Sequence, residues 1–533
     1  MGSVGPARMR GLLVCVLALC ALVIGALVTL ASAAGPGGWD HLGDRGTPGS
    51  DSLDLVASAL AVSSGVVYVG GAFTDAGGIA NADRIATWNG SSWSAVSSST
   101  QQIENGNVSA IAVSGDKVYA GGTFQNAGDD ANADNLAVWD GTSWEPFCDA
   151  TGPAFSGNVT SLQIIGRTLY VGGSFQNGAG IPSADYLLAC DLVSGASSTT
   201  VIDPAHPFAG PVHALTATSD GTLYAGGGFT NLENNLAADN VAYLPPGGTW
   251  QSMGLGAGPC QCAVTTFVRG LTAVGTDVYV GTDANDVAGI PQADHVARWN
   301  GSAWSAVGAG SGGGNGWFPT TASIEDLAGT GSHLFVTGSF QNANGDVRAD
   351  NVAFFDGTGW HPVGSDGAGN GPWIGTGLAL ALVDRRLYAA GSFTSAGGDP
   401  QARSVASFSL TQIIAYPTPT VTPSPPQNPI PTPTVTPSPT AAPPPPDVTA
   451  PATSLRRAQI KHAKRKATFR FASGEPGSRF RCRLDKKRFR PCTSPKTYRK
   501  LKPGKHVFRV KARDRAGNLD ATPAVKRFNI KKR

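Results

Sequence analysis

Basic side chains alternate with apolar ones in three short stretches near the C-terminal end, at residues 467–471, 480–484 and 506–512. This alternation predicts strands with one buried face and one cationic face. Since alternate strand positions lie roughly 7 Å apart, such rows predict a broad positive surface that binds anionic cell-wall polymer or phospholipid. The alternative is a surface that only keeps an exported domain soluble. The cations concerned are Lys466, Arg470, Arg479, Arg481, Arg483, Arg509, Lys511 and Arg513.

The charge of the chain is divided between two parts. From residue 451 onward there are 28 Lys and Arg against 4 Asp and Glu, whereas residues 34–450 have 10 against 33. The net charge of +3 therefore hides an acidic part and a basic part. Nucleic acid would satisfy the same electrostatics as a cell surface, but an exported chain argues against it. A third possibility is that the two parts bind each other.

Aspartates recur once in every stretch of about fifty residues, where hard cations would need several oxygen ligands together. One copy per repeat keeps these residues far apart, so we expect each to accept backbone N–H bonds in its own turn. We predict no cofactor, with local calcium near Asp129, Asp130 and Asp134, or near Asp283 and Asp286, as the alternative. The recurring aspartates are Asp83, Asp134, Asp185, Asp239, Asp294 and Asp350.

The usual signatures of hydrolases and metal enzymes are missing from the sequence. It contains no Gly-x-Ser-x-Gly and no His-Glu-x-x-His, and its histidines are scattered without metal-ligand spacing. We therefore expect a binding or scaffold protein and not an enzyme. The alternative is a secreted enzyme acting on polysaccharide, with an active site assembled from distant segments.

An aromatic residue within a Gly-Gly strand marks seven repeats at intervals of 51, 51, 54, 55, 56 and 53 residues. Each repeat contains four short alternating runs separated by Gly, Asp and Asn, which predicts one four-stranded antiparallel sheet per repeat. No such sheet can bury both faces alone, so seven should pack around an axis. The markers are Tyr68, Tyr119, Tyr170, Tyr224, Tyr279, Phe335 and Tyr388.

The seventh repeat lacks its fourth run. Elsewhere that run has the form Trp304-Ser-Ala-Val-Gly308, and a matching Trp39-Asp-His-Leu-Gly43 stands near the other end of the chain. We therefore predict that the N-terminal segment completes the last sheet and closes the ring.

The motif Gly121-Gly122, then Trp139-Asp140, then Trp144 resembles the kelch repeat. The extended pattern is similar to those of secreted bacterial propellers and fungal cortical-marker proteins. The resemblance covers residues 39–410 and implies a seven-bladed β-propeller, while it implies little about activity. The fifth repeat departs from the pattern, with Val280-Gly-Thr-Asp283 where other repeats have Gly-Gly-x-Phe.

Loop length varies mainly on the face that carries the blade-to-blade and second-to-third loops, and such loops commonly carry binding residues. Several have an aromatic residue shortly before the inner strand. These residues predict a broken collar that stacks on sugar rings or grips a peptide, so a glycan or a protein is the expected partner. The alternative is that they seal the seams between blades. They are Phe155, Phe208, Phe267, Trp317, Phe318 and Trp373.

The N-terminal residues have the layout of a secretory signal peptide, with arginines before residue 11, an apolar run and Ala31-Ser-Ala33. An uncleaved anchor is the alternative, and either predicts a secreted or cell-surface protein. An even number of cysteines beyond this segment favours disulfides. Cys482 with Cys492 is the preferred pair, and Cys148 with Cys190 is a second.

Residues 417–446 contain 14 prolines, which predicts an extended linker in the polyproline II conformation. Beyond it, Phe480-Arg-Cys-Arg-Leu-Asp485, Pro491-Cys-Thr-Ser-Pro495 and Ala512-Arg-Asp-Arg-Ala-Gly-Asn518 resemble a bacterial immunoglobulin-like domain. The predicted fold is thus all-β. It comprises a signal peptide (1–33), a seven-bladed propeller (34–411), a disordered Pro/Thr-rich linker (412–450) and a basic Ig-like β-sandwich (451–533).

Overall fold

The computed structural model describes most of residues 37–411 and 453–531. Short segments within these ranges are excepted, namely 45–49, 149–154, 199–207, 231, 233–234, 236, 255–261, 309–315, 332, 463–464, 474–477, 514–517 and 521–522. The predicted signal peptide and the predicted linker lie outside the described residues. The chain divides into two compact units, Met1–Thr420 and Val421–Arg533, each of which is described by itself.

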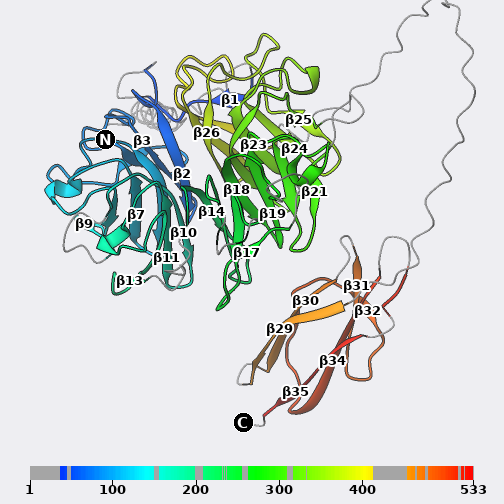
Figure 1. Cartoon of the computed structure of the whole chain (residues 1–533). Coiled ribbons are helices and arrows are strands. Elements are labelled where there is room, and N and C mark those ends of the chain that lie inside the picture. The colour runs from blue at the N-terminus through cyan, green and yellow to red at the C-terminus, as the bar shows by residue number, and fades with distance from the viewer. Residues whose placement is uncertain are drawn as a thin grey trace, which may run out of the picture. The chain divides into compact units, whose positions relative to one another are not determined.

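Seven four-stranded antiparallel sheets make up the described part of the first unit (Figure 1). The first three sheets are β2 (Ala57–Ser63), β3 (Val66–Gly71), β4 (Ile85–Trp88) and β5 (Trp93–Ala95); β6 (Val108–Ser114), β7 (Lys117–Gly122), β8 (Leu136–Trp139) and β9 (Trp144–Pro146); and β10 (Val159–Ile165), β11 (Thr168–Gly173), β12 (Leu187–Asp191) and β13 (Ser197–Ser198). The next three are β14 (Val212–Ala217), β15 (Leu223–Gly227), β16 (Val241–Leu244) and β17 (Gln251–Ser252); β18 (Val268–Val274), β19 (Asp277–Thr282), β20 (Val296–Trp299) and β21 (Trp304–Ala306); and β22 (Ser323–Gly329), β23 (Leu334–Ser339), β24 (Val352–Phe355) and β25 (Trp360–Pro362). The seventh is β26 (Gly377–Val383), β27 (Arg386–Gly391), β28 (Val405–Ser409) and β1 (Trp39–Asp40).

The first strand of each sheet packs against the first strand of the next, and β26 packs against β2. The seven sheets therefore form a closed ring, which confirms the predicted seven-bladed β-propeller. Paired glycines permit this close approach. A Cβ on Gly121 would lie 2.4 Å from Val159 Cγ1 of the next blade, and one on Gly122 would lie 1.9 Å from the carbonyl oxygen of Asn107.

The N-terminal segment closes the ring as predicted. Trp39 pairs with Phe408, and Asp40 pairs with Ser407, so β1 is the outer strand of the seventh blade. Trp39 is fully buried, and its Nε1 donates to the carbonyl oxygen of Val363 in the sixth blade at 2.9 Å. Burial of a large aromatic side chain is a strong stabilising contribution.

Short 3-10 helices lie in several loops between the second and third strands, each preceded by a residue with left-handed backbone conformation. The aspartate before the third strand braces this loop, because its Oδ1 accepts the backbone N–H of that residue. Asp134 binds Asn126 N at 2.7 Å, and Asp185 binds Asn177 N at 2.7 Å. The helices are η1 (Ala127–Asp129), η2 (Gly178–Gly180), η4 (Val287–Gly289) and η5 (Ala343–Gly345).

Two sheets form the described part of the second unit and share one apolar core. Phe469 of one sheet stacks on Phe508 of the other, with ring centroids 4.0 Å apart. The resemblance to Ig-like domains remains a prediction. One sheet contains β29 (Thr453–Lys461), β30 (Lys466–Ser473) and β33 (Lys496–Tyr498); the other contains β32 (Arg490–Cys492), β31 (Arg479–Leu484), β34 (Gly504–Arg513) and β35 (Ala524–Ile530).

Candidate functional site

Each inner strand of the propeller begins with a bulge. The pairing between the first and second strands shifts by one residue, as between Val268 and Gly270 in the fifth blade. Such a bulge leaves one residue unpaired and redirects its side chain. All seven bulge residues line one central cavity of about 190 Å³. They are Ser58, Ser109, Thr160, His213, Arg269, Glu325 and Leu378.

The cavity lies near the beginnings of the inner strands, which is the end reached by the blade-to-blade loops. Blades one to three contribute hydroxyl groups, and Asn107 bridges the first two of them. Its Oδ1 accepts the Ser58 hydroxyl at 2.9 Å, and its Nδ2 donates to Ser109 Oγ at 2.9 Å. Blades four to six contribute the charged arc, which we define as His213, Arg269 and Glu325. The cavity therefore has a neutral polar side and a charged side.

The departure of the fifth blade from the repeat has a structural cause at Thr282. In the other six blades a glycine pairs with the residue just before the bulge, and a Cβ on that glycine would lie 1.9 to 2.3 Å from the carbonyl oxygen that precedes this residue. Thr282 occupies this position in the fifth blade, and its Oγ1 donates to the Phe267 carbonyl oxygen at 2.7 Å. The carbonyl that excludes a side chain elsewhere is here the acceptor of a hydrogen bond.

Arg269 lies between two carboxylates, and its distance to each is longer than a hydrogen bond. Its Nη2 lies 3.7 Å from Asp283 Oδ2, and its Nε lies 3.6 Å from Glu325 Oε1. Its guanidinium carbon lies 5.9 Å from the centroid of the Phe267 ring. Within the described part of the chain Arg269 makes no direct hydrogen bond, and its side chain is 37% exposed. It is thus a cation with unused donors at the cavity wall.

Of the aromatic residues predicted to form a collar, Phe267 alone is exposed, at 45%. Its ring also contacts the His213 ring, with centroids 6.2 Å apart. The other five lie in the blade cores, which corresponds to the seam-sealing alternative, and four of them contact the phenylalanine that follows the second strand of the same blade. The buried residues are Phe155, Phe208, Trp317, Phe318 and Trp373.

Asp326 follows the bulge residue of the sixth blade, lines the cavity and is partly buried. Its Oδ2 accepts the N–H of Leu380 in the next blade at 2.8 Å, and its Oδ1 accepts Leu327 N at 2.8 Å. Burial raises the pKa of Asp326 to about 7, although both hydrogen bonds act to lower it. On the neighbouring side, burial and then the Arg269 cation lower the pKa of His213, which favours the neutral imidazole at pH 7.

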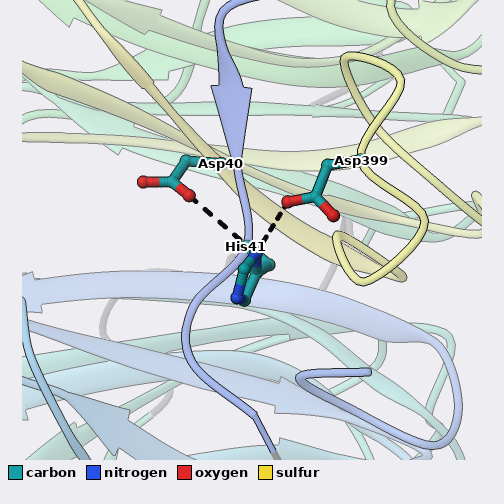
Figure 2. Close-up of side chains that lie close together, drawn as sticks. All are labelled: Asp40, His41 and Asp399. Carbon is teal, nitrogen blue, oxygen red and sulfur yellow. Dashed lines mark hydrogen bonds and ion pairs between the residues drawn. The ribbon is translucent and has the colours of Figure 1, made fainter. Parts of the chain in front are cut away.

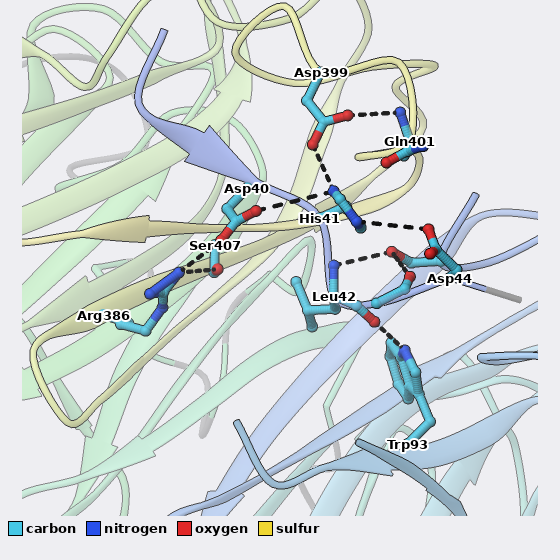
Figure 3. Close-up of polar contacts among 11 residues, drawn as sticks. Asp40, His41, Leu42, Asp44, Trp93, Arg386, Asp399, Gln401 and Ser407 are labelled. Carbon is cyan, nitrogen blue, oxygen red and sulfur yellow. Dashed lines mark hydrogen bonds and ion pairs between the residues drawn. The ribbon is translucent and has the colours of Figure 1, made fainter. Parts of the chain in front are cut away.

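Three polar residues cluster where β1 closes the ring. Figure 2 shows His41 between Asp40 and Asp399, with His41 Nδ1 2.6 Å from Asp399 Oδ2 and 3.9 Å from Asp40 Oδ1. His41 Nε2 lies 3.6 Å from Asp44 Oδ1, and Asp40 also meets Arg386 at 3.3 Å (Figure 3). The hydrogen bond with Asp399 is the main reason why the pKa of His41 is raised. We call this set the closing cluster.

The closing cluster is also the group of three in the described residues whose potential metal-binding atoms lie within 4.8 Å of one another. Its carboxylates are already engaged by His41, Arg386 and the backbone N–H of Gln401. The residues proposed for calcium are arranged otherwise. Asp130 and Asp134 accept backbone N–H groups in their own loop and Asp129 is exposed, while Asp283 faces Arg269 and the backbone N–H of Asp286 donates to Asp294.

The predicted basic surface of the second unit is centred on β31 and β34. Three pairs of cations stand directly opposite one another on these adjacent strands, namely Arg479 with Arg513, Arg481 with Lys511, and Arg483 with Arg509. The alternate residues Phe480, Cys482 and Leu484 face the core. We call these six cations the basic face.

An aromatic ring supports the basic face. Arg483 and Lys511 lie over the Phe489 ring, at 4.8 Å and 5.1 Å from its centroid. Apart from Arg513, none of the six cations forms an ion pair with a carboxylate of the described residues. Lys466 and Arg470 lie on β30, in the other sheet, so the structure does not bring them into the basic face.

Both predicted disulfides are present. Cys148 and Cys190 join the second blade to the third, with Cα atoms 5.6 Å apart, and Cys482 joins Cys492 within the second unit, at 5.8 Å. Disulfides of this kind are consistent with an extracytoplasmic location. None of the helices in the described residues is long and apolar enough to cross a membrane.

Comparison with known proteins gives no family and only distant structural likenesses. No protein-family model matches it, and no curated protein is significantly similar to it. Solved structures with a distant likeness include two extracellular domains from B. thetaiotaomicron. One belongs to the putative hybrid two component system BT3049 (TM-score 0.41, 10% identity, covering 92% of this chain and 56% of that one), and the other to the putative one component system BT4673 (0.40, 10%, 92% and 59%). YjhT is a third (0.33, 11%, 57% and 96%).

The chain spans less than two thirds of the length of the first two of these structures. Its own seven sheets define it as a seven-bladed β-propeller protein with a second, two-sheet unit. Proteins of this class bind ligands, act as scaffolds or catalyse reactions, so function must be argued from the sites.

The charged arc, Asp283 and Asp326 were not singled out as one site from the sequence. An alignment of the seven repeats at the bulge position would have shown hydroxyl-bearing residues in the first three repeats and His, Arg and Glu in the next three. The bulge itself carries no common sequence signature in this chain, since the residues on either side of it differ from blade to blade. Phe267 was grouped with the wrong residues, because Val264 and not Phe267 stands four residues before its inner strand begins, as Phe155 does.

Proposed function

We propose that the chain is an exported surface protein whose basic face attaches to phosphate-bearing polymer or phospholipid, while the propeller presents a ligand-binding face. The observation that carries this proposal is the set of three like-charged pairs on β31 and β34. Like charges directly opposite one another destabilise a sheet. A phosphate-rich partner would neutralise these cations and remove the repulsion. Binding would therefore stabilise an arrangement of like charges that destabilises the isolated sheet.

The geometry of the basic face suits an extended polyanion. Cations repeat along each strand at roughly 7 Å and across the strands at about 5 Å, which offers a two-row lattice to successive phosphates. Stacking of Arg483 and Lys511 on Phe489 holds two of these cations at the surface. Neutralising several cations releases counterions, so binding should weaken steeply as salt increases.

Export is proposed from the signal-like N-terminal sequence together with the disulfides. Teichoic-acid-like polymer and anionic phospholipid are the two phosphate sources available at such a surface, and the basic face does not by itself choose between them.

The test uses the full chain with phosphatidylglycerol vesicles, phosphatidylcholine vesicles and an immobilised phosphate polymer. We expect retention on an anionic support at low salt and release at moderate salt. The double variant Arg481→Gln/Lys511→Gln should lose most of the retention. The matched control Lys466→Gln/Arg470→Gln removes the same charge from the other sheet and should keep it.

Comparison of the vesicles with the polymer identifies the phosphate source. Equal loss in both double variants would mean that net charge alone is responsible, and no retention at low salt would reject the proposal. If the basic face binds the acidic propeller instead, the first double variant would alter sedimentation of the chain while no support retains it.

A further inference from the structure

We infer that the central cavity of the propeller binds a single neutral sugar unit, with Phe267 as its stacking platform and Arg269, Asp283 and Glu325 as its polar partners. This inference rests on the propeller acting as the ligand-binding part in the proposed function, and it names the site and the ligand class.

The size of the cavity sets the first limit. Its volume of about 190 Å³ is below the roughly 300–1,000 Å³ of sites for drug-sized molecules. One small ring enters, either as a free monosaccharide or as the end of a glycan chain. A folded peptide segment or a polysaccharide lying across the cavity would need more room.

Phe267 supplies an exposed apolar surface beside the cavity residues His213 and Arg269. Its side chain is 45% exposed while the other aromatics that precede inner strands are buried, and it contacts two cavity residues, His213 and Arg269. An exposed ring beside a concave polar wall is the arrangement that stacks against the C–H face of a pyranose. Thr282 anchors the Phe267 carbonyl group, so the ring is placed by the same change that makes the fifth blade irregular.

The polar groups alternate between donors and acceptors, as vicinal hydroxyls require. Arg269 has donors that no described residue uses, and one oxygen of Asp283 is buried without a hydrogen bond. Glu325 accepts the Ser323 hydroxyl at 2.7 Å and retains further acceptor sites. A sugar hydroxyl both donates and accepts, so one ring could bridge Arg269 and a carboxylate that now stand too far apart for a direct hydrogen bond.

The charge of the residues around the cavity discriminates between neutral and anionic sugars. Glu325 and Asp326 line the cavity together with Arg269, and Asp283 lies beside that cation at 3.7 Å, so the carboxyl groups outnumber the one arginine. The cavity is therefore net negative and disfavours a carboxylate or phosphate ligand. Across the cavity the blade-one to blade-three residues are hydroxyl-bearing and add no charge. Neutral sugars are thus preferred over uronic acids.

The competing explanation is that Arg269 and its two carboxylates only fill the centre of the ring. This explanation predicts that mutation of Arg269 or its carboxylates changes the stability of the propeller, and that no sugar binds in the cavity. The experiment measures binding of sugars to the full chain by saturation-transfer NMR, and their affinity by titration. The sugars are glucose, galactose, mannose, N-acetylglucosamine and glucuronic acid. We expect at least one neutral sugar to bind, glucuronic acid to bind more weakly, and the sugar to be recovered unchanged.

Three variants carry the test. Phe267→Ala and Arg269→Gln should each weaken binding about tenfold or more. Arg298→Gln is the matched control, because Arg298 lies in the same blade, is equally exposed at 37%, and pairs with Asp277 at 2.8 Å away from the cavity. It should bind as the unmodified chain does. Melting curves of all three establish that each remains folded.

The inference is overturned if no neutral sugar binds the unmodified chain, if Phe267→Ala retains its affinity within twofold, or if Arg298→Gln loses as much as Arg269→Gln. Vesicle and polymer retention of the same variants separates the two proposals. The cavity variants should be retained normally, and Arg481→Gln/Lys511→Gln should bind sugar normally. Loss of one activity without the other identifies which proposal fails.

Discussion

Replacement of Trp39 by alanine should destabilise the propeller through its closing blade. Trp39 is fully buried, its ring meets Trp373 edge-on at 4.9 Å, and its Nε1 donates to the carbonyl oxygen of Val363. Truncation of such a side chain costs about 3–5 kcal/mol. Loss of the donor also leaves a buried carbonyl group unpaired, which places the effect toward the upper end of that range.

The expected change in melting temperature follows from the size of the domain. Unfolding entropy of about 2.1 cal/mol/K per residue over about 370 residues gives about 0.8 kcal/mol/K at the midpoint. The alanine variant should therefore melt about 4–6 °C below the unmodified chain. Trp39→Phe keeps most of the apolar contact but loses the donor, and should fall between the two.

Differential scanning calorimetry of the full chain measures these shifts. A pair of truncations supplies the control, since a chain that begins at Gly37 retains β1 and a chain that begins at Asp44 lacks it. The first should melt normally, while the second should melt below the alanine variant. A shift of less than about 1 °C for Trp39→Ala, or equal melting of the two truncations, would refute the idea that β1 holds the ring closed.

The raised pKa of His41 means that its pairing with Asp399 stabilises the fold fully below the unfolded value of 6.5 and is lost as pH rises through the higher folded value. The melting difference between the unmodified chain and His41→Gln should therefore shrink as pH rises above about 6.5, and a difference that grows would contradict this. Because burial raises the pKa of Asp326 from 3.8 to about 7, the folded state holds its proton more tightly, and stability should fall as pH rises from about 4 to about 7. Asp326→Asn should flatten that slope in pH-dependent denaturation, whatever it does to absolute stability. Opening the Cys148–Cys190 bridge, which spans 42 residues, should cost about 4 kcal/mol by loop entropy, to be measured by urea denaturation of the Cys148→Ala/Cys190→Ala variant; an unchanged midpoint would reject it.

The ring and its closure were predictable because they depend on residues that repeat. Glycine pairs and outer-strand tryptophans recur at nearly constant spacing, and Trp39-Asp-His-Leu-Gly43 matches the one missing strand. Hydrophobic alternation also predicted correctly which face of β31 and β34 is cationic. Alternation describes a single strand, however, so it could not tell that Lys466 and Arg470 belong to the opposite sheet.

The cavity could not be predicted in the same way. Arg269 and Glu325 stand on different blades, and only radial packing of the fifth blade against the sixth brings them within 3.6 Å. The direction of each side chain depends on a bulge whose position follows from the ring and not from a local motif. The aromatic collar was predicted from distance along the chain, whereas burial depended on register, so Phe267 was grouped with residues of another kind.

The pairing of Trp39 with Phe408 also orders events in time. The segment that completes the last blade is synthesised before any complete blade exists, and its partner strand is among the last of the propeller to appear. Until that strand is made, the side chain of Trp39 stays exposed and the edge of its segment stays unpaired while the other six sheets form. Contacts this distant in sequence form slowly, so the open ring is the state most exposed to pairing with another chain. The seam that closes the molecule is therefore also the place where two nascent copies would most readily exchange strands.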